Sequence, residues 1–203
     1  MSDYGTMQTR IRRELNRDGL TADIRDAIDS SINYYESDRF FFNEYSASVG
    51  TVTGSVFVTA PTASLEIDLI NIVVSDNKRV MIERNYIDLE SRAESTGEPT
   101  DYAEFNDLIR IYPVADKEYT MYFFGKQQLT EVSSSSTDAA TNAWMTDGEV
   151  MVRSKAKEYI YEHRLRNSEQ GAKMRGLAEV EWRRLKKKTD DKIASGELKA
   201  FRF

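Results

Sequence analysis

The stretch STGEPTDYAEFNDLIRIYPVADKEYTMYFFG, from Ser95 to Gly125, decides the fold because it predicts three closely spaced strands. Asp101 to Phe105 and Leu108 to Tyr112 are extended runs separated by Asn106-Asp107, a two-residue turn typical of a hairpin. The run from Glu118 to Phe124 then places aromatic side chains on both faces of one strand. We expect that strand to be covered on both sides.

Strand signals continue upstream of this stretch. Leu65 to Val74 is a long apolar strand, and a turn at Ser75 to Lys78 returns the chain into Val80 to Ile82. Asn85 is a candidate cap for a short helix from Tyr86 to Ala93. Six or seven short strands in this region indicate a sandwich or a strongly curled sheet.

Helices are predicted on both sides of the β-rich region. Thr6 to Arg17 and a second helix, with Thr21 as its candidate N-cap, each carry one apolar face and should form an antiparallel pair. The aromatic run Phe40-Phe41-Phe42 follows them. We expect this run in the core, where the helices meet a sheet.

A capping box is the clearest local signal in the C-terminal part of the chain. Thr146 and Glu149 fit the S/T-x-x-E pattern. The apolar stripe that follows consists of Val152, Ala156, Tyr159, Ile160 and His163. This pattern predicts a helix that begins at Thr146 and packs on the first two helices. A bend is expected between Asn167 and Gly171, followed by a last helix that ends at Ser195-Gly196.

These elements predict an α+β fold in which both chain ends contribute to one helical bundle. Residues 1–44 supply its N-terminal helices, and residues 45–127 form an inserted antiparallel, sandwich-like β domain. Residues 128–145 contain a serine run and are expected to be a mobile polar linker. Residues 146–203 supply the C-terminal helices and an arm.

The composition excludes several classes of protein. The chain has no cysteine, so disulfides and thiolate metal sites are excluded. No apolar run is long enough to span a bilayer, and Met1 to Tyr4 lacks the basic and apolar segments of a leader. We therefore expect a soluble protein that is made in a cytoplasm and has no membrane partner.

Charge is distributed unevenly along the chain. Residues 153–203 hold 15 basic and 8 acidic side chains, a net charge of +7, whereas the rest of the chain carries −13. Opposite charge at the two ends favours docking between different partners or between copies of the chain. The alternative is a basic helix that is simply solvated.

Four pieces of the sequence together resemble the phage adaptor proteins of tailed-phage head-to-tail connectors. They are Phe40-Phe41-Phe42-Asn43, Gly97-Glu98-Pro99-Thr100, Ile109 to Pro113, and Trp144 to Val152. Their order covers most of the chain.

This resemblance implies a non-enzymatic virion protein that forms a ring, usually of twelve copies, beneath the portal protein. It implies that neighbouring adaptor subunits, the portal, and tail nozzle or tail fibre proteins are the partners. DNA would pass through the ring without specific binding, and no cofactor is implied. The C-terminal helix and arm would reach the portal, with the β insert facing outward.

The candidate portal-binding residues lie at the C-terminal end. The arm offers apolar and basic side chains, and the helix before it offers a basic cluster that an acidic protein surface or DNA phosphates could contact. The candidates are Leu198, Lys199, Phe201, Arg202 and Phe203 in the arm, and Arg183, Arg184, Lys186, Lys187 and Lys188 in the helix.

The sequence offers little catalytic chemistry, so no catalytic or metal-binding residue is predicted. His163 is the only histidine, and we expect it in the core or at an interface. The carboxylates Glu94, Glu98, Asp101 and Glu104 could form a glycosidase-type pair only across a cleft. The alternatives to an adaptor are therefore a capsid or tail decoration protein that binds through the β domain, and a tail-associated cell-wall hydrolase.

Overall fold

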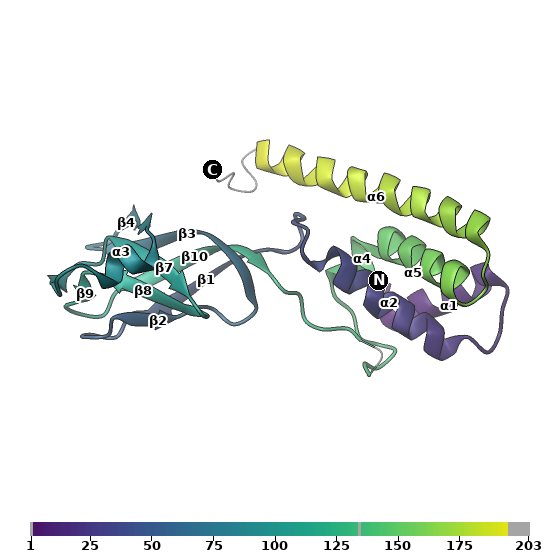
Figure 1. Ribbon diagram of the computed structural model, residues 1–203, viewed down its shortest axis with the longest axis horizontal. Helices are drawn as coiled ribbons and strands as arrows, with labels where there is room; N and C mark the ends of the chain where they lie inside the picture. Colours follow the sequence, from purple (N-terminus) through teal and green to yellow (C-terminus); the bar gives the residue numbers. More distant parts are fainter. Residues whose placement is uncertain (1, 134, 195–203) are drawn as a thin grey trace. The chain divides into compact units, whose positions relative to one another are not determined.

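The computed structural model describes residues 2–133 and 135–194, and it confirms the α+β class. The chain divides into two compact units (Figure 1). The helical unit contains the described residues up to Asn43 and from Gln128 onward, and the β unit spans Glu44–Gln127. Each unit has its own hydrophobic core.

The helical unit is built from two N-terminal and three C-terminal helices. These are α1 (Tyr4–Leu15), α2 (Thr21–Glu36), α4 (Ala143–Thr146), α5 (Glu149–His163) and α6 (Ser168–Ala194). Their apolar faces meet in one core, whose buried members include Met7, Ile11, Ile24, Ile28, Phe40, Trp144, Val152, Ile160 and Leu185. Segments far apart in the sequence therefore fold together, because no single helix can bury its own stripe.

Helix α1 has a side-chain cap at its start, whereas α2 does not. The Asp3 carboxylate accepts a hydrogen bond from the Thr6 amide at 2.7 Å, satisfying a first-turn donor. Thr21 was predicted to cap α2, but it is the first helical residue, and Leu20 stands at the cap position without a side-chain bond. That prediction is wrong because an N-cap residue precedes the first helical residue, and Thr21 already lies inside the helix.

The predicted capping box at Thr146 is also wrong. Asn142 is the N-cap of the short helix α4, and its side-chain oxygen accepts from the amides of Trp144 at 2.9 Å and Met145 at 3.3 Å. Thr146 ends α4, and α5 begins at Glu149 with Gly148 as its N-cap. The threonine instead donates to the Asn142 carbonyl at 3.4 Å.

Replacing Asn142 with Ala should therefore destabilise the helical unit more than Thr146→Ala does. Loss of an N-cap oxygen typically costs about 1 kcal/mol, and Asn142 also donates to the Thr130 carbonyl at 2.8 Å. Thr146 is exposed, so its loss should cost less than about 0.5 kcal/mol. Urea unfolding followed by tryptophan fluorescence measures both. Equal losses would mean that Asn142 does not act as the cap.

Helix α5 buries a narrower stripe than its sequence predicted. Val152, Ala156 and Ile160 are fully buried, as expected. His163 is exposed, and its ring lies 4.5 Å from that of Tyr159, so the prediction of a core histidine is wrong, while that of an interface histidine stays a prediction. His163 is the last residue of α5, beyond the part of the helix that other elements cover.

The residues between the last two helices form a short connection. Arg166 adopts a left-handed backbone conformation there, with a φ of 49°. Gly171 was one of the residues predicted to bend the chain, but α6 runs through it without interruption. Gly171 is buried, and a Cβ at this position would lie 2.8 Å from the Glu162 side chain. The glycine therefore allows α5 and α6 to approach closely.

The linker segment is packed on the helical unit where the structure describes it. Val132 is buried in the helical core, and the carbonyls of Asp138 and Ala140 accept hydrogen bonds from the first residues of α1. The Asp138 carboxylate pairs with Arg25 at 3.0 Å. These contacts attach the described part of the linker to the helical unit, because apolar residues that reach the core interrupt the polar ones. The mobility expected of the serine run stays a prediction.

The β unit contains ten strands and one short helix. The strands are β1 (Glu44–Gly50), β2 (Phe57–Thr59), β3 (Ser64–Val74), β4 (Asn77–Val80), β5 (Ile82–Glu83), β6 (Thr96–Gly97), β7 (Asp101–Phe105), β8 (Leu108–Tyr112), β9 (Val114–Ala115) and β10 (Thr120–Gln127). The helix is α3 (Tyr86–Glu90), and Asn85 caps it as predicted, accepting from the Ile87 amide at 2.9 Å.

The strands form two four-stranded sheets, ordered β1-β10-β3-β4 and β2-β8-β7-β5, and a small β6-β9 pair. The predicted hairpin is confirmed as β7 and β8, and both Asn106 and Asp107 have positive φ angles, typical of a two-residue hairpin turn. The third strand of the opening stretch, β10, belongs to the other sheet. One core joins both sheets, with Ile70, Met121 and Phe123 from the first and Tyr102 and Ile111 from the second.

Strand β10 is fully covered on one face only. Met121 and Phe123 are buried in the core between the sheets, while Tyr122 and Phe124 on the opposite face are partly exposed. The Lys78 ammonium lies 4.2 Å from the centre of the Tyr122 ring and supplies part of the outer cover. The predicted cover on both sides is therefore complete on the inner face and partial on the outer face.

Candidate functional site

The basic cluster on α6 is split between two environments. Lys186 turns toward the segment after α2, where its ammonium lies 3.0 Å from the Asp38 carboxylate and donates to the Arg39 carbonyl at 3.2 Å. It also lies 5.1 Å from the centre of the Phe40 ring. Arg183, Arg184 and Lys187 are exposed. The sequence placed these residues in one cluster, but only part of the cluster faces solvent.

A second lysine of the cluster also contacts the aromatic run. The Lys188 ammonium lies 4.0 Å from the centre of the Phe41 ring, an arrangement that favours the cation electrostatically. The buried Thr189 hydroxyl accepts from the Phe41 amide at 3.0 Å and donates to the Leu185 carbonyl. These contacts hold α6 against the segment that follows α2.

The arm lies outside the described residues. This applies to the candidate site residues Leu198, Lys199, Phe201, Arg202 and Phe203, and to the predicted helix stop at Ser195-Gly196. Helix α6 is described as far as Ala194, and the arm follows it directly in the sequence.

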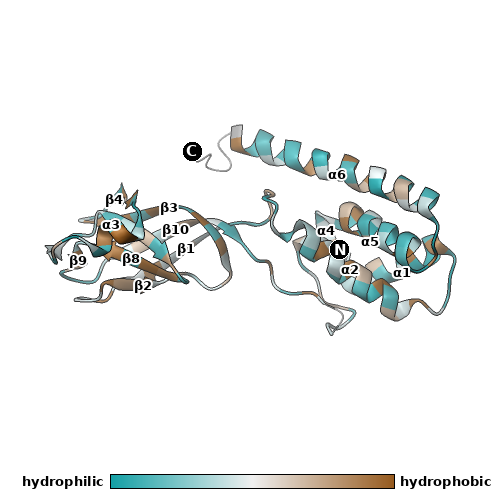
Figure 2. Cartoon of the chain, in the orientation of Figure 1, coloured by the Kyte–Doolittle hydropathy of each residue, from teal (hydrophilic) through white to brown (hydrophobic). Residues whose placement is uncertain are grey.

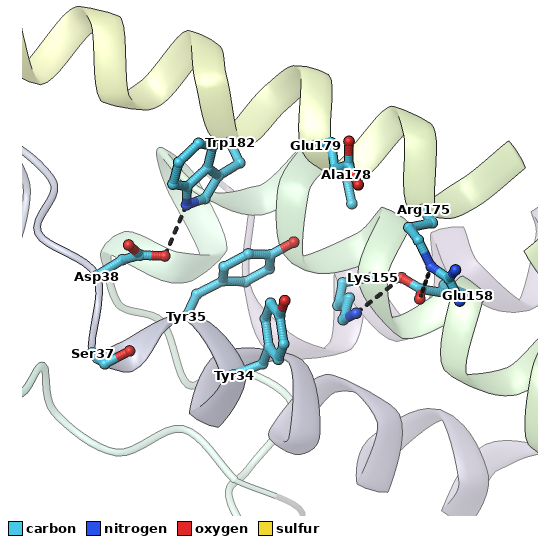
Figure 3. Close-up of a pocket in the computed structure, with 10 residues that line it drawn as sticks. All are labelled: Tyr34, Tyr35, Ser37, Asp38, Lys155, Glu158, Arg175, Ala178, Glu179 and Trp182. Carbon is cyan, nitrogen blue, oxygen red and sulfur yellow. Dashed lines mark hydrogen bonds and ion pairs between the residues drawn. The ribbon is translucent and has the colours of Figure 1, made fainter. Parts of the chain in front are cut away.

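A groove of about 460 Å³ lies between α2, α5 and α6. Figure 3 shows aromatic and charged side chains from all three elements pointing into it. Its lining consists of Tyr34, Tyr35, Ser37, Asp38, Lys155, Glu158, Arg175, Ala178, Glu179 and Trp182.

Three charged groups of the groove pair with one another, whereas Asp38 and Glu179 pair with Lys186 and Arg183 outside its lining. The Glu158 carboxylate is buried and accepts from Arg175 at 2.8 Å, with Lys155 at 3.1 Å on its other oxygen (Figure 3). The hydrogen bond to Glu158 raises the pKa of the Arg175 guanidinium. A buried carboxylate is stabilised only with such partners, so this network holds α5 and α6 together.

Aromatic groups form the rest of the groove. The Trp182 indole donates to Asp38 at 2.8 Å, and the Lys155 ammonium lies 4.2 Å from the centre of the Tyr34 ring. Burial raises the pKa of the Tyr35 hydroxyl, which keeps it neutral and excludes a role as a base near neutral pH. The residues that line the groove include Ser37 but no cysteine or histidine. It is suited to holding helices or a partner's side chain rather than to catalysis.

The four carboxylates near the Gly-Glu-Pro turn do not gather around a cleft. Glu98 pairs with Arg79 at 2.7 Å, whereas Asp101 pairs with Arg84 at 2.7 Å and Arg92 at 3.4 Å. Asp101 and Glu104 are three residues apart in β7, so their side chains point to opposite faces. The structure therefore gives no support to a glycosidase-type pair.

Asp101 instead acts as a structural ion-pair centre. Although burial opposes its charge, hydrogen bonds from Arg84 and Thr100 and the nearby Arg92 hold its pKa below the ordinary value of 3.8. A carboxyl whose pKa is lowered on folding stabilises the folded state above its unfolded pKa. That stabilisation is lost as the pH falls through the lowered folded-state value.

Asp101→Asn should cost the β unit about 1 kcal/mol of stability at neutral pH, because it leaves Arg84 and Arg92 without their charged partner. The difference from the parent should shrink toward zero well below pH 3.8, where both chains carry a neutral group. Urea unfolding followed by circular dichroism across this pH range measures it. Asp76→Asn, at an exposed turn position, is the control. A pH-independent difference would rule out the charge as its cause.

Neither a metal site nor a membrane span is found in the part of the chain that the structure describes. Within residues 2–133 and 135–194, no group of three or more acidic or histidine side chains could hold a metal ion. In the same ranges, no helix combines the length and the apolar character needed to cross a membrane.

Sequence reasoning missed the residues that hold the groove together. Asp38, Tyr34 and Arg175 carry no local motif, and only the place of Asp38 just before the aromatic run could have drawn attention to it. Asp38 and Tyr34 depend on contacts with residues more than one hundred positions away in the chain, and Arg175 depends on Glu158 of the neighbouring helix α5.

Comparison with known proteins places this architecture in a family. A family model described as SU10 adaptor protein matches residues 2–191, which include residues of both units and most of α6. No curated protein matches the chain.

Proposed function

Because this chain belongs to the SU10 adaptor protein family, we propose that it joins the phage head to the tail as a ring-forming structural protein. The ring, with twelve copies as the expected number, would lie beneath the portal protein and bind tail nozzle or tail fibre proteins. DNA would pass through it without specific contacts. The protein would be part of the virion and would catalyse no reaction.

The fixed position of α6 in the helical unit is the observation that supports this function most strongly. Lys186 and Trp182 both bind Asp38, and Thr189 bonds to Phe41, so the helix is held at several points along its second half. A helix fixed in this way can present an exposed basic surface at a defined place on the subunit. Figure 2 shows hydrophilic residues along most of α6.

The proposed portal contact has two parts. The arm would supply apolar anchors, Leu198, Phe201 and Phe203, together with the cations Lys199 and Arg202. The exposed bases Arg183, Arg184 and Lys187 would add charge that steers the subunit toward an acidic surface. Lys186 and Lys188 would act indirectly, because their ammonium groups hold the segment from Asp38 to Phe41.

In a ring, one surface of each subunit contacts a different surface of the next subunit. Such a heterologous contact can close into a ring when the rotation between copies allows it. The uneven charge of the chain, with +7 in residues 153–203 and −13 elsewhere, supplies opposite signs for that contact.

The isolated protein should be a monomer that assembles only on the portal. Much of its surface is charged, and its large exposed apolar residues are divided between the two units, which is typical of a conditional interface rather than an obligate one. Sedimentation at micromolar concentration should show one subunit, and negative-stain imaging with portal-bearing particles should show a ring. A ring without the portal would overturn the templated assembly. No ring in either sample would overturn the proposed adaptor function.

A further inference from the structure

The β unit carries an apolar groove open to solvent. Leu65 is 45% exposed, Phe105 51% and Ile87 73%, and all three line a hollow of about 700 Å³ between the start of β3, the end of β7 and α3. The Tyr86 ring stacks on that of Phe105 at 4.3 Å between centroids. Large apolar side chains gathered around one hollow are costly in water, so this surface is suited to a partner.

Acidic side chains surround the apolar groove. Glu66, Glu83 and Glu104 line it, with Arg84 as the cation among the lining residues. Desolvation, followed by the negative charge of Glu83, Glu66 and Asp68, raises the pKa of the Glu104 carboxyl. The β unit as a whole has 14 acidic and 7 basic side chains, a net charge of −7. The occupant of the groove should therefore be apolar with a basic border.

The outer face of α6 has this chemistry. Leu177 and Val180 are 50% and 60% exposed, and they lie between Lys173 on one side and Arg184 and Lys187 on the other. The spacing of four, three, four and three residues places all five on one face of the helix. The pairs of Lys173 with Glu169 and of Arg184 with Glu181 are local, and both cations are more than half exposed, so these pairs compete weakly with a partner's carboxylates.

We propose that the apolar groove of the β unit binds the outer face of α6 from a second copy of this chain. Leu177 and Val180 would contact Leu65, Ile87 and Phe105, and the bases would face the groove's carboxylates. Both surfaces are present on every subunit and differ from each other, so the contact is heterologous, as a ring requires. This inference rests on the proposed ring, and it assigns Arg184 and Lys187 to the neighbouring subunit instead of the portal.

The absence of cysteine allows a direct test by disulfide cross-linking between single-cysteine variants. Ile87→Cys and Val180→Cys proteins are mixed at high concentration and on portal-bearing particles, and are then oxidised. Val52→Cys replaces Ile87→Cys in the matched control, because Val52 is 68% exposed in the β unit but does not line the groove. Cross-linked heterodimer should exceed the control several-fold on the particles, where the ring assembles. Equal yields would overturn the proposed contact.

Exchanging the charges of the two surfaces tests whether the cross-link comes from this contact or from random collision of the subunits. Glu83→Lys in the groove-bearing copy should lower the yield about fivefold, the change expected for about 1 kcal/mol. Arg184→Glu in the α6-bearing copy should restore it by re-pairing opposite charges. Failure of this rescue would count against the assigned surfaces.

Imaging of the same particles distinguishes the failure of this inference from the failure of the proposed function. A ring without the Ile87–Val180 cross-link would overturn the interface and keep the adaptor. A cross-link without any ring would keep the contact and overturn the proposed assembly. Binding of the groove to a purified tail protein, with no cross-link between copies, would show that the occupant is not a second copy.

Discussion

Removal of residues 195–203 is expected to abolish docking to the portal while leaving the helix and strand content unchanged. Helix α6 is described to Ala194, and its contacts with the rest of the helical unit come from residues before the cut. The truncated chain therefore keeps the contacts of α6 that the structure describes. Loss of the nine residues should act on binding alone.

The expected size of this effect follows from the arm's apolar side chains. Leu198, Phe201 and Phe203 would each contribute on the order of 1.5 to 3 kcal/mol if a partner buried them fully. Lys199 and Arg202 can pair with carboxylates around the pockets that receive them. Repetition of these contacts around a ring multiplies the effect on the assembly, so even partial loss should prevent stable docking.

Co-sedimentation with portal-bearing particles measures docking of the truncated chain. A full-length variant with Leu198, Phe201 and Phe203 all changed to Ser separates the apolar anchors from the charge of the arm. Val52→Ser, which removes an exposed apolar side chain from the β unit, is the control. If the truncated chain sediments with the particles as well as the parent does, the arm is not a docking element.

Gly125→Ala is expected to destabilise the β unit by about 3 kcal/mol, at the upper end of the usual range for overpacking. Gly125 lies in β10, between Tyr45 of β1 and Ile67 of β3. A Cβ at this position would lie 2.0 Å from the Glu66 carbonyl oxygen, far inside any permitted contact. The clashing carbonyl belongs to the backbone of a paired strand and cannot rotate away as a side chain could. The clash can therefore be removed only if the register of β10 shifts at the irregularity beside Phe124.

Region-resolved hydrogen exchange measures this effect, because it reports on peptides from residues 44–127 separately. Both tryptophans, Trp144 and Trp182, belong to the helical unit, so their fluorescence reports on that unit as an internal reference. Gly97→Ala is the matched control, since a Cβ there meets nothing within 4 Å. It should change stability by less than about 1 kcal/mol. Similar protection in Gly125→Ala and the parent would show that β10 accommodates the added methyl group.

Local patterns in the sequence were sufficient to identify many individual elements. The hairpin of Asp101–Phe105 and Leu108–Tyr112, the long strand ending at Val74 and the cap at Asn85 were all predicted and are confirmed. Each depends on turn chemistry or on side-chain alternation over a few residues. Such interactions are fixed by neighbours in the chain, so the sequence alone is enough.

The sequence alone did not show which of two nearby residues caps a helix. Thr146 matched a capping box, yet Asn142 holds the cap because its single oxygen reaches two amides and its amide group bonds to Thr130. Both residues suit an N-cap by type. The packing of Trp144 and Met145 into the helical core determines which of the two begins a helix.

The sequence by itself determined the α+β class, the family, the strand and helix periodicities, and the split of charge between the two ends of the chain. Only the tertiary structure decided that β10 leaves its neighbouring hairpin for the other sheet, and that Lys186 binds Asp38 while Arg184 faces solvent. The type of a side chain and the periodicity of the residues around it do not determine which sheet a strand joins or which partner a lysine binds. These outcomes depend on which distant segments share a core, because burial and pairing are set by neighbours in space rather than in sequence.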